Sequence, residues 1–235
     1  MTGTPEYGET WVYESIVGAL PGIELSDRVA IAVQFVAFEA ALVAVAAAYG
    51  LWDAFVPGTV AVVVAAGGSW LMLRYSQTVR GLRPPEGYRR VLFGSSIEVV
   101  LGVVAFVLLV TYLFVTDPQT SEQSLLTEFL GPEPPALAVA LALLILWDVV
   151  YRIGTCWWAT VAGLWRAVAY EFGAETTRAY ARADGLNVVF AALQLLFVPF
   201  VLGHPILVGV LVGHVLAVVT VATLSVLVQW RSQGK

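Results

Sequence analysis

Six polar or ionisable side chains interrupt stretches of this sequence that are otherwise apolar. They are Glu39, Glu98, Asp148, Arg152, Gln194 and His214. An ionisable group in hydrocarbon is costly, so such a residue usually pairs with another group or serves an ion or proton pathway. These six residues are therefore the candidates for transport or ion conduction.

The depth of each residue in its segment divides the six into two groups. At a rise of about 1.5 Å per residue, four lie mid-way along their helices and are expected near the bilayer midplane: Glu39, Asp148, Gln194 and His214. Glu98 and Arg152 are expected closer to the cytoplasmic side. Transport predicts that the four midplane side chains line one water-accessible cavity.

The spacing of the charges predicts specific pairs. Asp148 and Arg152 are four residues apart with the acid first, which is the favourable order for an ion pair on a helix. Arg152 is also expected to reach Glu98 on another helix. Glu39 is then the carboxylate without a basic partner, and His214 is its expected partner in proton exchange.

A structural interpretation of the same residues stays open. Asp148 and Arg152 would then only fasten the span 135–165 to the span 94–116, and Glu39 would be protonated and hydrogen-bonded. His214 would be a packing residue. Gln194 would form a hydrogen bond between helices, as amide side chains in membrane bundles do.

The composition indicates that lipid is the solvent for much of the chain. Of the 235 residues, 59% are hydrophobic and only 12% are charged, whereas soluble proteins carry about 25% charged residues. Because a helix satisfies its own backbone hydrogen bonds in lipid, we expect an all-α integral membrane protein. Eleven arginines against one lysine, with acidic loops, resemble the composition of proteins from salt-adapted archaea.

Six stretches are long enough and apolar enough to cross a bilayer, which takes about 20 residues each. Their expected bounds are about 28–50, 57–75, 94–116, 135–165, 185–202 and 205–230. Together they form a transmembrane domain over 28–230, and 231–235 is a tail. Residues 1–27, which are acidic, are expected to form a short amphipathic helix at the membrane surface.

The distribution of basic residues predicts the orientation. With the N-terminus in the cytoplasm, every basic residue except Arg152 falls on the cytoplasmic side, and the loops 51–56, 117–134 and 203–205 contain none. Short cytoplasmic loops are enriched in Lys and Arg. We therefore expect a multi-pass protein of the cell membrane with both termini in the cytoplasm.

Several kinds of chemistry are excluded by the residues themselves. The single cysteine, Cys156, leaves no disulfide framework, and no lysine lies inside a span to bind retinal. His204 and His214 are ten residues apart, which argues against a haem held between them. No metal, cofactor or catalytic residue is assigned, and the chain is not expected to be an enzyme.

Three functions are compatible with these observations. The first is a small transporter or an ion- or proton-conducting protein. The second is a structural or assembly subunit of a membrane complex, with membrane lipids, a second copy or other subunits as partners and no nucleic acid. The third is a membrane-embedded lipid-modifying enzyme, which would use clustered acids near the membrane interface. The loop 166–184 carries acids at that position, but we interpret them as solvated loop residues: Glu171, Glu175 and Asp184.

Overall fold

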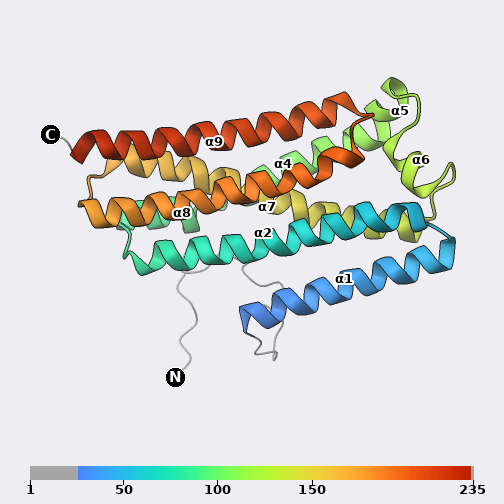
Figure 1. The fold of residues 1–235 in the computed structure, drawn as a ribbon, viewed down its shortest axis with the longest axis horizontal. Coiled ribbons are helices and arrows are strands. Elements are labelled where there is room, and N and C mark those ends of the chain that lie inside the picture. The colour runs from blue at the N-terminus through green and yellow to red at the C-terminus, as the bar shows by residue number, and fades with distance from the viewer. Residues whose placement is uncertain (1–25, 234–235) are drawn as a thin grey trace.

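The computed structural model describes residues 26–233, with side chains as far as Arg231. The expected amphipathic segment 1–27 therefore lies almost wholly outside the described residues. The elements within them are all helical (Figure 1). In chain order they are α1 Asp27–Tyr49, the 3₁₀ turn η1 Trp52–Ala54, α2 Phe55–Gly81, α3 Glu86–Gly94, α4 Ile97–Thr111, the π-helical turn η2 Tyr112–Thr116, α5 Asp117–Thr120, α6 Leu125–Leu130, α7 Ala136–Ala169, α8 Ala174–Leu193, the 3₁₀ segment η3 Gln194–Phe200 and α9 Pro205–Gln233.

Six helical segments are long and apolar enough to cross a membrane, which confirms the all-helical architecture expected from the sequence. They are Asp27–Tyr49, Trp52–Gly81, Glu86–Thr120, Ala136–Ala169, Ala174–Phe200 and Pro205–Arg231. The chain thus has the features of a multi-pass membrane protein.

Two helices extend well beyond the apolar stretches that predicted them. Helix α2 continues to Gly81 rather than ending near residue 75, and α8 begins at Ala174 rather than near 185. The segment added to α8 is rich in Ala and Arg, which favour helix. Hydropathy marks only the part of a helix that suits lipid, so the polar ends were expected as loops.

The third span is broken rather than continuous. Helix α3 ends at Gly94 and α4 begins at Ile97, and Ser96 between them has a φ of 53°. A positive φ is uncommon for a residue other than glycine. The break changes the direction of the chain before α4 packs on α7.

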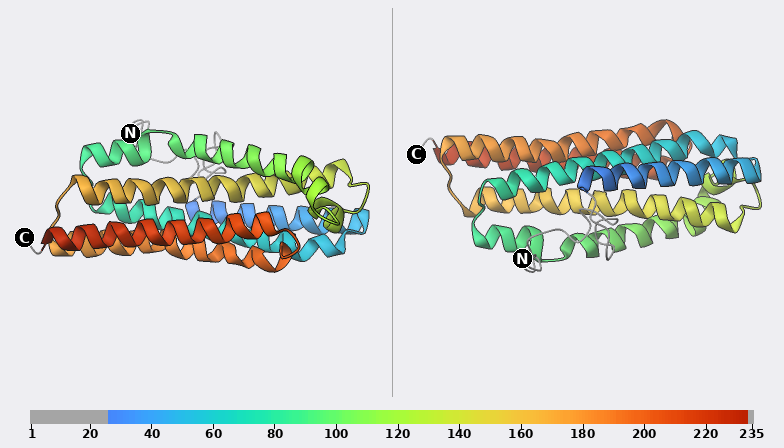
Figure 2. Two further views of the ribbon diagram at one scale, coloured as in Figure 1. Left: turned by 90° about the horizontal axis from the view of Figure 1, so that it is seen from above. Right: turned by 90° about the horizontal axis from the view of Figure 1, so that it is seen from below.

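Helix α7 is the centre of the bundle, and α1, α2, α3, α4, α8 and α9 all contact it (Figure 2). Its crossing with α4 is especially close. A Cβ on Gly154 would lie only 2.8 Å from the backbone nitrogen of Gly102. Small residues at such positions let two helix backbones approach, as is common in membrane bundles.

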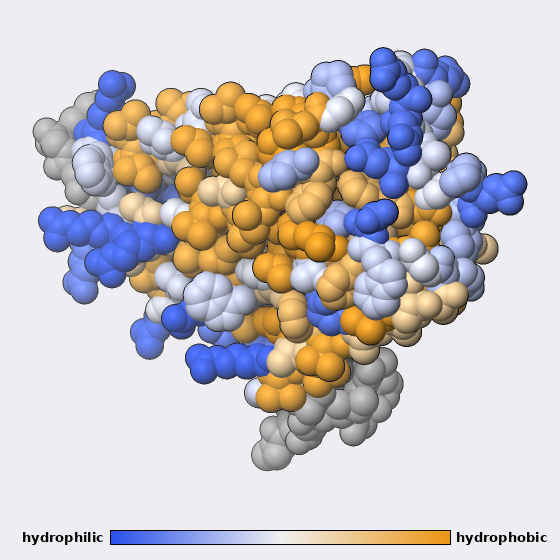
Figure 3. All heavy atoms as spheres, turned by 45° about the vertical axis from the view of Figure 1, so that its right-hand side comes forward, coloured by the Kyte–Doolittle hydropathy of each residue, from blue (hydrophilic) through white to orange (hydrophobic). Residues whose placement is uncertain are grey.

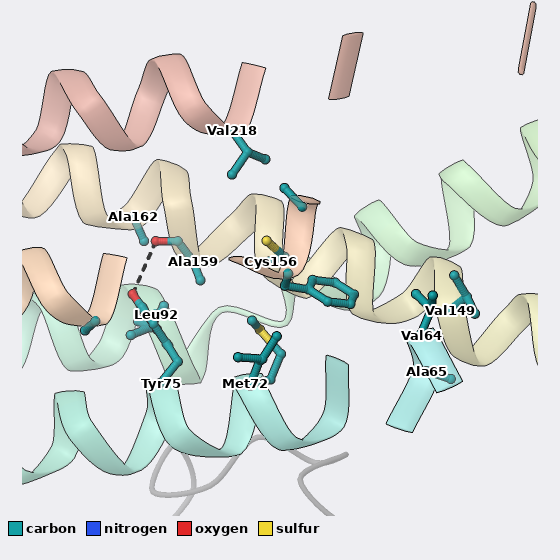
Figure 4. Close-up of a cluster of buried hydrophobic side chains, with 14 of the residues drawn as sticks. Val64, Ala65, Met72, Tyr75, Leu92, Val149, Cys156, Ala159, Ala162 and Val218 are labelled. Atoms are coloured by element: carbon teal, nitrogen blue, oxygen red, sulfur yellow. Dashed lines mark hydrogen bonds between the residues drawn. The ribbon is translucent and has the colours of Figure 1, made fainter. Parts of the chain in front are cut away.

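The hydrophobic core lies mainly between α2, α7 and α8. Cys156 is fully buried at its centre, with Met72 and Tyr75 of α2 nearby (Figure 4). The hydroxyl of Tyr75 donates a hydrogen bond of 3.4 Å to the carbonyl oxygen of Ala159, so the one polar atom of this ring is satisfied.

The two ends of the bundle differ in charge. One end, here called the arginine-rich end, comprises the ends of α2, α7 and α9 together with α3 and the start of α8. The other, here called the loop end, comprises the turn between α1 and α2, helices α5 and α6, and the turn between η3 and α9 (Figure 1). Hydrophilic side chains gather at both ends of the face seen in Figure 3, with a broad hydrophobic band between them.

Candidate functional site

The predicted ion pair on α7 is present. Arg152 Nη2 lies 2.6 Å from Asp148 Oδ1, and both side chains are about 6% exposed. The other carboxylate oxygen, Oδ2, accepts a hydrogen bond of 2.8 Å from Gln34 Nε2 of α1. The pair is therefore neutral as a unit and also fastens α1 to α7.

Glu98 and Glu39 both lack a cation among the described residues, and Glu98 is the more deeply buried of the two. Glu98 is 3% exposed, forms no ion pair with any described residue, and has no hydrogen bond to Oε2. The expected contact with Arg152 is absent because the arginine side chain runs along α2, where its Cδ would lie 3.0 Å from a Cβ on Gly68. Glu39 is half-buried; Oε2 accepts a hydrogen bond of 3.1 Å from Thr59 Oγ1, and Oε1 has no partner among the described residues.

The other two midplane candidates lie apart from these groups. Gln194 is fully buried at the start of η3, and neither amide atom has a hydrogen-bond partner among the described residues. His214 of α9 lies beside Trp157, with ring centroids 6.2 Å apart. None of the four midplane side chains lines the apolar cavity that runs along α7.

One cavity among the described residues is lined wholly by apolar side chains. It has a volume of about 340 Å³, and every residue that lines it is Ala, Val, Leu, Ile, Phe, Pro or Gly. Its lining on α7 runs from Ala138 to Ile153, which is about 22 Å at 1.5 Å per residue. The cavity is thus long and narrow and extends from the loop end past the middle of the bundle.

The local sequence explains why this space is open. On α7 the residues facing it recur at helical spacing and include the small side chains of Ala138 and Ala142. Helices α4 and α9 both line the cavity and both pack on α7, but they have scarcely any direct contact with each other. Pro199 lies inside η3, and a proline removes a backbone donor and disturbs an α-helix, so α8 continues there as a 3₁₀ segment.

A polar cluster that the sequence did not predict lies at the loop end. His204 Nδ1 is 2.7 Å from Asp117 Oδ1, and His204 Nε2 is 3.4 Å from Glu128 Oε2. His204 and Asp117 are almost fully buried. The two acids lie on opposite sides of the imidazole ring, so they do not form a shared metal site with it, and no group of three metal-binding side chains is found within 26–231.

A second unpredicted cluster lies at the arginine-rich end and corrects the interpretation of Asp184 as a solvated loop residue. Asp184 is 2% exposed and pairs with the fully buried Arg166, with Nη2 2.7 Å from Oδ2. The same guanidinium donates to the hydroxyl of Tyr88 and lies 4.1 Å from the ring centroid of Tyr180. Because α8 begins at residue 174, Asp184 is inside a helix that packs on α7 and α9.

One family model matches this chain over residues 6–225, and its description is a family of unknown function, DUF7530. The chain belongs to the DUF7530 family. No curated protein and no solved structure matches it. Three features of this DUF7530 member bear on its function: the dispersed polar groups, the apolar cavity and the two buried clusters.

These features differ in the chemistry that they permit. A pathway for a polar solute needs polar groups along its walls, whereas the cavity of this DUF7530 chain has none. Conversely, a pocket for an apolar molecule needs shape and apolar walls, with few polar groups. The ion pairs of α7 and α8 connect neighbouring helices and are directed into the bundle rather than into the cavity.

Proposed function

We propose that this protein is a multi-pass membrane protein that binds the acyl or isoprenoid chain of a lipid in the cavity along α7. The observation that supports the proposal is the volume of about 340 Å³ lined only by apolar side chains. An apolar cavity of about 150 Å³ already stays dry and binds small hydrocarbons. Because the lining is apolar, an apolar occupant gains van der Waals contacts with it and so stabilises the fold.

The shape of the cavity favours a chain over a compact ligand. The cavity follows α7 for about 22 Å, and the hydrocarbon core of a bilayer is about 30 Å thick. A lipid chain beside the bundle already lies roughly parallel to the helices. Entry between α4 and α9, which line the cavity without packing on each other, requires no change in the direction of the chain.

The orientation expected from the arginines completes the proposal. If the arginine-rich end faces the cytoplasm, both termini are cytoplasmic and the cavity opens toward the outer leaflet of the cell membrane. Membrane lipids are then both the solvent and the first ligand of this protein. The proposal is for binding of a chain, with no catalytic step.

A pair of alanine substitutions on α7 tests the proposal. Ala142 lines the cavity, whereas Ala140 on the same helix is exposed. We expect the purified protein to bind the fluorescent polyene cis-parinaric acid, Ala142→Phe to weaken this binding at least tenfold, and Ala140→Phe to leave it unchanged. Equal binding by wild type and Ala142→Phe would exclude the cavity as the site.

Proton-coupled transport is the second candidate, and Glu98 is the residue that favours it. A carboxyl group that is almost fully buried without a cation stays neutral or exchanges a proton. In liposomes with an imposed pH gradient, transport predicts a proton flux that Glu98→Gln abolishes. Absence of flux in the wild type, or the same flux in Glu98→Gln, would remove this candidate.

A further inference from the structure

The short helix α6 covers the cavity at the loop end, and α5 lies shortly before it in the chain. Four apolar residues of α6 form part of the cavity wall: Leu125, Leu126, Phe129 and Leu130. Helix α6 has few other attachments, since it is only 6 residues long and lies between the turns that follow α5 and precede α7. The position of α6 therefore determines whether the cavity is closed at this end.

We propose that α5 and α6 form a lid over the chain-binding cavity, and that His204 is a latch that holds the lid closed when its imidazole is protonated. The inference rests on the proposed function in that it assigns a regulation to the same cavity. His204 lies in the turn between η3 and α9, so the latch joins the lid to the wall of the bundle.

One end of the latch is built around Asp117 at the start of α5. Its Oδ1 faces His204 Nδ1 at 2.7 Å and accepts a hydrogen bond of 2.6 Å from Ser121 Oγ. The hydroxyl of Tyr112 donates to the same oxygen, and the backbone N–H of Leu125 donates to Oδ2 at 2.6 Å. A carboxylate that accepts this many hydrogen bonds is ionised, and His204 Nδ1 must therefore carry a proton.

The other end of the latch depends on the second proton of the ring. A neutral imidazole that donates from Nδ1 has only a lone pair at Nε2. Glu128 Oε2, which faces Nε2 at 3.4 Å, is an acceptor when ionised, so the two groups attract only if His204 is an imidazolium. The titratable groups that face His204 are thus Asp117 from α5, Glu128 from α6 and Tyr112 from η2.

The consequence is a lid whose contact between His204 and Glu128 depends on the charge of the imidazole. At low pH both ring nitrogens donate, and α5 and α6 are both fastened to His204. At higher pH the Nε2 contact is lost, and Glu128, whose side chain is 47% exposed, turns to solvent. Helix α6 then keeps only the hydrogen bond from the N–H of Leu125 to Asp117 and its apolar contacts in the cavity wall, while the contact between His204 and Asp117 persists.

A conservative substitution separates the latch from other effects of pH. In Glu128→Gln the amide nitrogen donates to a neutral Nε2 and the amide oxygen accepts from a protonated one. The lid should then stay closed at either pH. Glu133→Gln, in the exposed segment just after α6, is the matched control because it removes the same charge away from His204.

Hydrogen exchange of residues 117–130, corrected for the intrinsic effect of pH, measures the lid without any ligand. We expect protection in the wild type and in Glu133→Gln to fall about tenfold between pH 5.5 and 8.5, and in Glu128→Gln to stay constant. Release of cis-parinaric acid should accelerate in parallel.

The possible failures of the two proposals are distinguishable. Protection that does not change with pH in the wild type, or that changes equally in Glu128→Gln, overturns the latch. Release of the probe that does not follow a confirmed change in protection overturns the role of α5 and α6 as a lid. If the wild type binds no probe at all, the proposed function fails, and the exchange data alone decide whether the latch exists.

Discussion

Removal of Arg166 should destabilise this protein more than the loss of any single hydrogen bond. The guanidinium is fully buried and pairs with Asp184 through distances of 2.7 and 3.4 Å. It also donates to Tyr88 at 3.2 Å and lies over the ring of Tyr180. Arg166→Met keeps much of the apolar volume but leaves the carboxylate of Asp184 buried without a cation.

The magnitude follows from the burial of both partners. Breaking one side of a buried ion pair costs about 3–5 kcal/mol, and 1 kcal/mol corresponds to about 2–4 °C in Tm for a chain of this size. We therefore expect Arg166→Met to lower the Tm in detergent by about 6–20 °C. The double variant Arg166→Met/Asp184→Asn removes both charges and should recover most of this loss.

The assay is thermal unfolding of the purified protein in one detergent, with both single variants and the double variant measured together. The decisive quantity is the difference in Tm between Arg166→Met and the double variant. In the double variant a neutral amide replaces the carboxylate of Asp184 and needs no cation. If Arg166→Met is no less stable than the double variant, the carboxylate is not left uncompensated and the reasoning is wrong.

Three further outcomes follow from the packing and the cavity. Gly154→Val should lower the Tm strongly by separating α7 from α4, whereas Gly209→Val, which has open space around its Cα, should not. Tyr75→Phe removes the hydrogen bonds to Tyr88 and Ala159 and should cost about 1 kcal/mol in the free energy of unfolding, measured by thermal or denaturant unfolding. Leu146→Asn places an amide in the cavity wall and should weaken binding of cis-parinaric acid about 5–150-fold, as expected for a polar group left without a partner at about 1–3 kcal/mol; stronger binding would indicate a polar ligand.

The sequence predicted what depends on composition and on local spacing. The six membrane-length helices follow from apolar stretches, and the pair of Asp148 and Arg152 follows from four-residue spacing on one helix. Pairs between distant segments were missed, as for Arg166 with Asp184, because a polar segment of helix resembles a loop when hydropathy alone is considered. The partner of Glu98 was assigned wrongly because depth in the membrane says nothing about the direction in which Arg152 points.

The cavity could not be predicted from residue types, since it results from side chains that do not fill the space between helices. Yet polar residues lie close to its apolar lining. Ile145 and Val149 line the cavity, while Asp148, between them in the sequence, is held by Gln34 and Arg152. The carboxylate itself borders a separate and much smaller space, which it shares with Gln34 and Phe38. The ion pair at mid-depth joins α1 to α7 and is held apart from the apolar lining of the cavity, an arrangement compatible with the binding of a lipid chain.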